Sequence, residues 1–414
     1  MNILSLFDGM SCGQQALERC GFKVDKYFAS EIDKYAIKVT MANYPDTIQL
    51  GSVVDIDGYK LPKIDLLMGG SPCQSFSFAG KRKGMATKCE TEILTLEHYL
   101  QLKADGFEFE GQSYLFWEYM RLLNEVKPKY FLLENVEMGE KWERILSKAI
   151  GVNGVHINSS LVSAQNRKRI YWTNIGMESS GLFGDMQSII KQPKDKGILL
   201  KDVLESEVDE KYFLSDTMIN SFNIKTKKYN DLGGGFCFKP TEGNNKGRTI
   251  TNPGKNRMDD NFIIYNNKRL TETIEKHKEN LDQGTLIDSY NQSIHKDKSI
   301  TISTRINNGN THIVNNKSLN KNQQKKFNPN INADKSNTLT LAQGRAGSSG
   351  EYMDAVSKIA KLISRIRRLT PIECERLQTI KDNYTNHVSD SQRYKMLGNG
   401  WTIDVICHIL NYIK

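Results

Sequence analysis

The chain has 414 residues, of which 38% are hydrophobic and 9% aromatic, enough for one large or two ordinary domains. No stretch approaches 18 apolar residues and the first six residues lack a basic start, so we expect neither a membrane span nor a signal peptide. The seven cysteines are scattered without a Cys-x-x-Cys pair, which disfavours disulfides or a zinc site and favours the cytoplasm.

The net charge of +9 is concentrated in one segment. Residues 221–350 hold 21 Lys and Arg against 11 Asp and Glu, a net of +10, while the rest of the chain has a net of −1. A basic excess on one module is typical of a protein that binds a polyanion such as nucleic acid. A solvated, lysine-rich surface is the alternative interpretation of this composition.

Short apolar strands alternate with amphipathic helices over the first 175 residues. The expected elements, in chain order, are strand Asn2–Phe7, helix Gly13–Cys20, strand Tyr27–Ser30, helix Lys34–Tyr44, strand Ile64–Met68, helix Tyr114–Glu125, strand Tyr130–Glu134 and strand Arg169–Asn174. This alternation predicts a parallel, doubly wound α/β sheet. Such sheets bind ligands at the carboxyl ends of their strands.

The composition changes at about residue 176, where Asn, Gly, Lys, Ser and Thr become abundant. Three similar β-branched runs predict strands of a smaller, mostly β or irregular module, unless their similarity is chance: Arg248–Thr251, Ser299–Ser303 and Asn337–Thr340. A helical pattern returns from Leu369, with an apolar face over Thr402–Ile413. We therefore expect residues 1–175 and 365–414 to form one domain, into which residues 176–364 are inserted.

Two segments near the N-terminus have the character of a ligand site. Phe7-Asp8-Gly9-Met10-Ser11-Cys12-Gly13 joins the first strand to the first helix, where glycines let the backbone approach a ligand. It is not a G-x-G-x-x-G dinucleotide motif. Glu31 ends the second strand, where an acid can accept hydrogen bonds from ribose hydroxyls. An ordinary glycine turn and a surface glutamate are the alternatives.

Catalytic side chains are predicted at the ends of later strands. Gly69-Gly70-Ser71-Pro72-Cys73-Gln74 presents a thiol, whose thiolate form is a strong nucleophile, although a buried structural cysteine is the alternative. Glu134 ends another buried strand, where a carboxylic acid can donate a proton. In Gln165-Asn166-Arg167-Lys168-Arg169, alternate residues share one face of a strand, so the two arginines can hold an acid and a base carbonyl together.

In this order, these segments resemble the DNA (cytosine-5) methyltransferase family. The landmarks are the Phe-x-Gly turn, Pro-Cys-Gln, Glu-Asn-Val, Gln-x-Arg-x-Arg, a variable region, Arg368–Ile380 and Leu397-Gly398-Asn399-Gly400. The resemblance covers about 230 residues at the two ends of the chain and is strongest to phage and bacterial members. It implies a Rossmann-like, S-adenosylmethionine-dependent fold, with the basic insert as the target recognition domain.

The resemblance also implies the cofactor site. Phe7 would stack on adenine, Glu31 would bind ribose, and Leu115 and Asn399 would line the same pocket. The remaining implied cofactor residues are Gly9, Gly13, Ile32, Ser52, Val53 and Gly400. Three residues depart from the family pattern: Ser5 and Ser52 stand where Asp is usual, and Gly400 replaces Ser. No metal is implied.

The implied reaction is methyl transfer to C5 of a cytosine that is flipped out of duplex DNA at a specific sequence. Cys73 would attack C6, Glu134 would protonate or hydrogen-bond N3, Arg169 would bind O2, and Arg167 would orient Glu134. The enzyme would act as a monomer in the cytoplasm of a bacterial or phage-infected cell, with or without a cognate restriction nuclease. A tRNA methyltransferase of the same fold and a non-catalytic DNA-binding relative are the alternatives.

Overall fold

The computed structural model describes residues 1–72, 92–109, 111–180, 185–232, 237–251, 257, 260–266, 285–288, 293–296, 311–313 and 364–413. Their contacts divide the chain into two compact units. The first comprises Met1–Tyr212, Asn220–Phe262 and Arg368–Lys414, and the second comprises Phe213–Ile219 and Ile263–Arg367. The expected boundaries of the inserted domain, residues 176 and 364, remain a prediction.

A seven-stranded sheet of the order β3-β2-β1-β4-β5-β7-β6 forms the centre of the first unit. Its strands are β1 (Asn2–Leu6), β2 (Lys26–Ser30), β3 (Ile48–Gln49), β4 (Leu66–Gly70), β5 (Tyr130–Val136), β6 (Val155–Asn158) and β7 (Lys168–Thr173). β1 pairs in parallel with β2 on one side and β4 on the other. The chain order therefore reverses between β1 and β4, where α/β sheets place their ligands.

The sheet is mixed rather than wholly parallel, which corrects one expectation. β7, predicted as the strand Arg169–Asn174, runs antiparallel to both β5 and β6. The connection from β6 to β7 contains only a short 3-10 helix, Ser159–Leu161, whereas a parallel neighbour needs a long crossover. The reversal brings the start of β7 beside the end of β5, so residues from both strands meet at one edge of the sheet.

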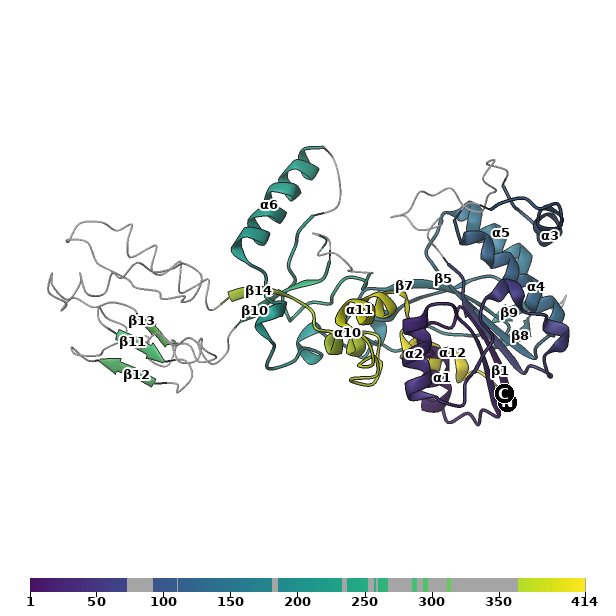
Figure 1. Ribbon diagram of the computed structural model, residues 1–414, viewed down its shortest axis with the longest axis horizontal. Helices are drawn as coiled ribbons and strands as arrows, with labels where there is room; N and C mark the ends of the chain where they lie inside the picture. The colour runs from purple at the N-terminus through teal and green to yellow at the C-terminus, as the bar shows by residue number, and fades with distance from the viewer. Residues whose placement is uncertain are drawn as a thin grey trace. The chain divides into compact units, whose positions relative to one another are not determined.

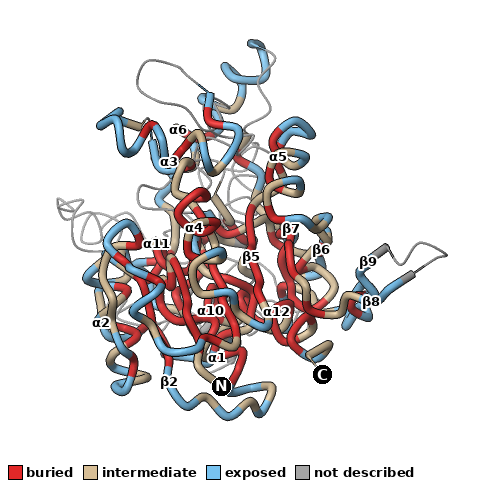
Figure 2. The backbone as a smooth tube through the Cα atoms, turned by 90° about the vertical axis from the view of Figure 1, so that its right-hand side faces the viewer, coloured by how far each residue is buried: buried red, intermediate tan, exposed pale blue. Residues whose placement is uncertain are grey.

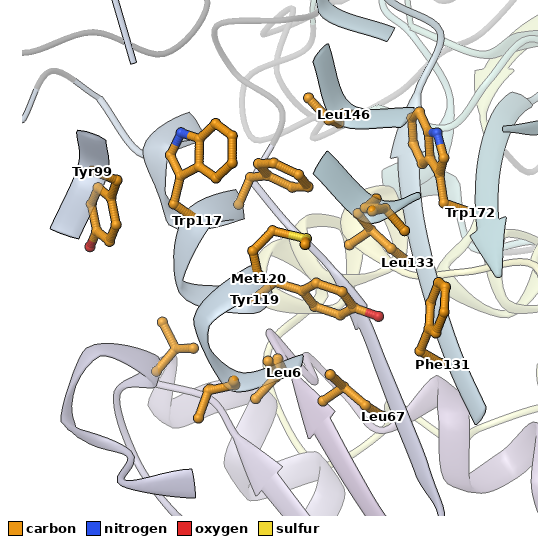
Figure 3. Packing of buried hydrophobic residues seen from close by; sticks show 14 of the residues in the cluster. Leu6, Leu67, Tyr99, Trp117, Tyr119, Met120, Phe131, Leu133, Leu146 and Trp172 are labelled. Atoms are coloured by element: carbon orange, nitrogen blue, oxygen red, sulfur yellow. The ribbon is translucent and has the colours of Figure 1, made fainter. Parts of the chain in front are cut away.

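Helices cover both faces of this sheet. The helices of its first part are α1 (Cys12–Arg19), α2 (Lys34–Asn43), α3 (Leu96–Ala104), α4 (Phe116–Val126) and α5 (Glu140–Ile150). Leu6, Leu67 and Leu133 of the central strands pack with Trp117 and Tyr119 of α4 in one hydrophobic cluster (Figure 3). Because side chains alternate along a strand, Ile3 and Ser5 of β1 point to the opposite face.

The end of the chain returns to the first unit, as the helical pattern after Leu369 predicted. Its helices are α10 (Pro371–Leu377), α11 (Asp390–Asn399) and α12 (Ile403–Leu410). α12 packs beside α1, although 385 positions separate Arg19 from its ion-pair partner Asp404 (Figure 1). α10 begins with a capping box in which Thr370 and Glu373 bond reciprocally, a sequence-encoded helix start.

Buried and exposed segments differ clearly along the first unit. Strands β5 and β7 are drawn almost wholly as buried, whereas the hairpin of β8 (Met177–Ser180) and β9 (Asp185–Ser188) is exposed (Figure 2). α6 (Asp216–Asp231) follows, with Phe222 as its one buried residue. In the part of the chain that the structure describes, no helix is long and apolar enough to cross a bilayer.

The second unit contains two small sheets. β10 (Phe262–Asn266) pairs with β14 (Ser364–Arg368), and β11 (Thr285–Asp288) lies between β12 (Ser293–Lys296) and β13 (Thr311–Ile313). Of the three β-branched runs, residues 248–251 do not form a strand, because their backbone groups bond to the side chains of Gln165, Arg167 and Asn261. The other two runs lie outside the described residues.

Candidate functional site

The turn between β1 and α1 has an unusual backbone. Phe7, Gly9 and Ser11 all lie in the left-handed region, with φ angles of 56°, 58° and 58°. This conformation is ordinary for glycine but strained for Phe7 and Ser11, and such strain is concentrated at ligand sites. Nothing lies within 4 Å of the position that a β-carbon on Gly9 would take. The turn therefore leaves open space beside its backbone, as a bound cofactor requires.

Glu31 is held rigidly against this turn. Its Oε2 accepts a hydrogen bond from the Gly9 amide at 2.8 Å, and its Oε1 accepts from the amides of Ile32 and Asp33, each at 2.8 Å. Each carboxylate oxygen has more than one lone pair, so these bonds leave acceptor capacity for hydroxyl groups. The first turn and Glu31, predicted separately as ligand-site segments, are thus in direct contact.

Three of the other predicted cofactor residues share one environment. Val53 belongs to the hydrophobic cluster, and Phe7 and Leu115 pack against it half-buried. Ser52 caps the 3-10 helix that begins at Val53, without a side-chain capping bond. Ile32, in contrast, is 71% exposed, which leaves a large apolar side chain free to cover a ring. Phe7, Val53 and Leu115 thus provide apolar packing at the end of the first strands.

Neighbouring atoms lie so close to Gly13 and Gly400 that neither position has room for a side chain. A β-carbon on Gly13 would overlap Met68 Sδ and lie 2.9 Å from the Tyr27 hydroxyl, so glycine lets α1 pack onto the sheet. A β-carbon on Gly400 would lie 2.7 Å from Met10 Cε and 3.3 Å from Cys12 Sγ. Asn399 is exposed at the end of α11, next to Gly400. The N-terminal and C-terminal segments of the predicted cofactor site therefore meet.

Glu134, near the end of β5, and Arg169, near the start of β7, form an ion pair; we call the sheet edge where these two strand ends meet the predicted catalytic edge. Arg169 Nε lies 2.8 Å from Glu134 Oε1, and the two side chains are only 12% and 11% exposed. The antiparallel register, in which Val136 faces Arg169, brings these side chains diagonally together. The structure thus adds a direct contact from Arg169 to this carboxylate, and the expectation that Arg167 orients Glu134 stays a prediction.

The segment that leads to Cys73 ends beside Glu134. Gly70 is in register with Glu134 in the parallel β4–β5 pair. Asn135 is buried and donates to the Ser71 carbonyl at 3.3 Å and to its hydroxyl at 3.0 Å. Asn135 thus fixes the exit from β4, a role that we did not predict, although it stands in the Glu-Asn-Val motif. Cys73 itself lies outside the described residues.

Arg167 is 3% exposed and bonds to three backbone carbonyls. Its guanidinium donates to the carbonyls of Ile250 at 3.2 Å, Gly398 at 3.2 Å and Gly400 at 2.8 Å. Gln165 is also buried while Asn166 and Lys168 are exposed, so the predicted alternation holds through the start of β7. Arg167 thereby ties the predicted catalytic edge to the Gly398–Gly400 segment and to residue 250.

A second buried amide, Gln378, was also missed. Its Nε2 donates to the carbonyls of Leu397 at 2.8 Å and Gly400 at 3.2 Å, and its Oε1 accepts from Gln165 at 2.9 Å and Thr402 at 2.8 Å. Every polar group of this side chain is used, which makes the arrangement specific. Its only sequence signal was its place within the Arg368–Ile380 landmark.

Burial changes the acidity of two groups in the first turn. Burial raises the pKa of Asp8 to about 6, despite hydrogen bonds from Ser11, Ser5 and Tyr27 that act in the opposite direction. Burial likewise raises the pKa of the Cys12 thiol to about 12, so this thiol is neutral at physiological pH. Cys12 is therefore unsuited to act as a nucleophile in this structure. Among the described residues, no cluster of His, Cys, Asp and Glu could hold a metal ion.

Solved structures share this architecture over nearly the whole chain. A structure of the methyltransferase EhMeth from Entamoeba histolytica superimposes with a TM-score of 0.56 at 13% identity, covering 100% of this chain and 97% of the other. A DNMT2 mutant from Spodoptera frugiperda gives a TM-score of 0.53 at 17% identity, with 99% and 98% coverage. At these identities, the likeness establishes the fold: the Rossmann-like sheet of a methyltransferase.

Sequence comparison establishes the family. The model of the C-5 cytosine-specific DNA methylase family matches residues 1–414, and the chain belongs to that family. Orphan methyltransferase M.SPRI of Bacillus phage SPR is 29% identical, over 98% of this chain and 95% of its own length. Type II methyltransferase M.HgiCI of Herpetosiphon aurantiacus is 27% identical, with 96% and 93% coverage. The protein is therefore an S-adenosylmethionine-dependent DNA (cytosine-5) methyltransferase, as the resemblance implied.

Proposed function

We propose that this enzyme methylates cytosine in duplex DNA at a specific sequence, through a covalent bond between Cys73 and C6 of a flipped-out cytosine. The observation that carries the proposal is the ion pair between Glu134 and Arg169 at 2.8 Å, beside the strand end that leads to Cys73. A buried acid paired with a planar guanidinium presents hydrogen-bonding groups in a fixed geometry. This arrangement suits the N3–O2 edge of a cytosine.

The chemistry follows from the weakness of C5 as a nucleophile. The Cys73 thiolate adds to C6. As Glu134 protonates or hydrogen-bonds N3, the ring becomes an enamine, in which C5 is nucleophilic and can take the methyl group. Arg169 binds O2, as expected, and also keeps Glu134 in place through their ion pair. S-adenosylmethionine, when bound, supplies an electrophilic methyl group. Loss of the C5 proton, for which water can serve as the base, and elimination then release Cys73.

The cofactor would lie against the turn after β1. Gly9 leaves open space beside its backbone, and Glu31 is fixed at the same turn, so these residues fit a ligand with ribose hydroxyls. Phe7, Leu115, Val53 and Ile32 would form the apolar walls around its adenine ring. Ser52 and Asn399 would supply polar groups at the rim, and Gly13 and Gly400 the close backbone approaches.

The basic segment would bind the DNA. Residues 221–350 hold the excess positive charge, and we propose residues 176–364 as the target recognition domain inserted into a catalytic domain of residues 1–175 and 365–414. Lysines and arginines that neutralise phosphates supply affinity and offset the cost of flipping, a few kcal/mol. Since catalytic and recognition parts occur in one chain, a monomer suffices, acting in the cytoplasm of a bacterial or phage-infected cell.

Trapping with 5-fluorocytosine tests the covalent step. Duplex DNA that contains this base should form a stable adduct, because fluorine cannot leave C5 as a cation after the methyl group has been added. The Cys73→Ala variant should lose both adduct and methylation but still bind DNA and S-adenosylmethionine. Normal methylation by this variant, or an adduct at another cysteine, would contradict the proposal. Bisulfite sequencing of DNA from expressing cells would identify the target sequence.

A further inference from the structure

Asp8 is a buried carboxylate for which the proposed reaction has no use. It lies in the middle of the turn from Phe7 to Gly13 and is 9% exposed. Its amide donates to the Ser30 carbonyl at 3.0 Å, which fixes the turn against the end of β2. Its Oδ1 accepts from the Tyr27 hydroxyl at 2.7 Å and its Oδ2 from the Ser11 hydroxyl. The carboxylate is therefore held rigidly within the proposed cofactor turn.

The groups around Asp8 provide no positive charge. Its hydrogen-bond partners are the hydroxyls of Ser5, Ser11 and Tyr27. The titratable groups that face it are Tyr27 on β2, Glu31 after β2, Cys12 at the start of α1 and Tyr384 between α10 and α11. Burial raises the pKa of both tyrosines and of Cys12, so these groups are neutral near pH 7. Among the described residues, Asp8 forms no ion pair, and Glu31 is a second acid.

An ionised carboxylate in this position is costly. Burial without a counter-ion disfavours the charged form, and an uncharged residue of the same shape would avoid that penalty. The pKa of about 6 means that Asp8 is nevertheless mostly ionised at neutral pH. A buried charge that lacks a counter-ion among the described residues, in a turn with strained backbone, is a candidate for interaction with a charged ligand.

We propose that the Asp8 carboxylate makes the cofactor site selective for a cationic ligand, so that it favours S-adenosylmethionine over its neutral product S-adenosylhomocysteine. The two molecules differ by one methyl group, which turns a neutral thioether into a sulfonium cation. A fixed negative charge attracts the cation across the poorly screened interior and has little effect on the thioether. The inference rests on the proposed function, in that the turn from Phe7 to Gly13 must bind the cofactor.

Isothermal titration of both ligands against the full-length protein tests this inference without catalysis. In Asp8→Asn, which keeps the size and much of the hydrogen bonding, Kd for S-adenosylmethionine should rise on the order of tenfold. Kd for S-adenosylhomocysteine should change much less. Equal changes for both ligands would show that Asp8 acts only through the shape of the turn, and unchanged values would show that its charge is irrelevant. Either result overturns the inference.

Two control variants separate charge from structure. Tyr27→Phe keeps the carboxylate but removes a hydrogen bond that lowers the pKa of Asp8, so the pH dependence of the preference for S-adenosylmethionine should move to higher pH without the preference being lost. Asp65→Asn neutralises a half-buried carboxylate at the amino end of β4, where it accepts from the Asn2 amide at 2.8 Å, and should leave the ratio of the two Kd values unchanged. A shift of that ratio in Asp65→Asn, or loss of the preference at every pH in Tyr27→Phe, would contradict a specific role for Asp8.

The pH dependence of the wild-type protein gives a measurement that does not depend on a variant. The preference for S-adenosylmethionine should fall as the pH is lowered from 7.5 to 5, because Asp8 becomes protonated, and Asp8→Asn should show no such fall. Titratable groups that the two ligands have in common affect both Kd values alike, so their effect cancels in the ratio of the two Kd values. A wild type that binds neither ligand would instead refute the proposed cofactor site, whereas intact binding with a pH-independent ratio refutes only this inference.

Discussion

Gly400 and Met10 lie so close together that a β-carbon on Gly400 would come within 2.7 Å of Met10 Cε. The contact joins the segment after α11 to the turn after β1, which are almost 400 residues apart in the sequence. Met10, which is 1% exposed, occupies the space that a side chain at position 400 would need.

We expect Gly400→Ser to destabilise the protein by about 1–3 kcal/mol and to weaken S-adenosylmethionine binding, because the added atoms overpack this region. Met10→Ala should recover part of the stability when combined with Gly400→Ser. Urea unfolding of the two single variants and the double variant gives a coupling energy, expected to exceed 0.5 kcal/mol, roughly the limit for independent sites. Strict additivity would show that the two residues do not compete for space.

Glu134→Gln and Arg169→Lys should each lower the single-turnover rate of methyl transfer by about 10²–10⁴-fold. The glutamine cannot donate a proton to N3 in the same way, and the lysine lacks the planar fork that holds both the acid and a carbonyl. Lys168→Gln is the matched control, since Lys168 is exposed on the opposite face of β7. A rate for either active-site variant equal to that of the control would remove the pair from the mechanism.

Arg167→Ala should cost about 2 kcal/mol or more of unfolding free energy, since the buried carbonyls of Ile250 and Gly398 lose their donor at about 1–3 kcal/mol each. The destabilisation should be accompanied by weaker binding of S-adenosylmethionine, because two of the three carbonyls that Arg167 binds belong to the Gly398–Gly400 segment. Arg144→Ala provides the comparison: its pair with Glu140 is 74% and 82% exposed, so about 0.5 kcal/mol or less is expected. Comparable destabilisation of the two variants in urea unfolding would argue against a structural role for Arg167.

The stability difference between Asp8→Asn and the wild type should depend on pH. The folded-state pKa of Asp8, about 6, lies above its ordinary value of 3.8, so the folded protein binds this proton more tightly than the unfolded chain. The stabilisation is complete below about pH 4 and disappears as the pH rises through 6. As the pH rises from 4 to 7, the free energy of unfolding of Asp8→Asn should therefore increase relative to that of the wild type by up to about 3 kcal/mol. A constant difference would mean that Asp8 titrates normally.

Three exposed lysines of α6 should contribute to DNA affinity: Lys225, Lys227 and Lys228. Their joint replacement by Gln should weaken binding and reduce the slope of log K against log salt by about 0.9 for each phosphate that is no longer neutralised. The control replaces exposed lysines near the amino ends of β2 and β4: Lys23, Lys26 and Lys63. Filter binding over a range of salt concentrations measures both slopes. Equal slopes for the two triple variants would exclude α6 from phosphate binding.

The strands expected in the first 175 residues differ from those observed by a few residues at most, although β3 and β6 were not predicted. The predicted strand Tyr27–Ser30 is β2, Lys26–Ser30, and Ile64–Met68 is β4, Leu66–Gly70. These strands are apolar runs bounded by Gly, Pro or charged residues, a local signal that needs no tertiary information. Because the carboxyl ends of parallel strands meet at one edge, the position of the first turn beside Glu31 also followed from the pattern.

The sequence by itself determined the family, the strand ends that present Glu31 and Glu134, and the return of the last helices to the first unit, since apolar periodicity and short motifs are local properties of the chain. Only the tertiary structure decided that β7 runs antiparallel, that Arg169 contacts Glu134, and that Met10 fills the space beside Gly400. Those relations depend on register, direction and close packing between segments far apart in the chain, and no local pattern encodes them.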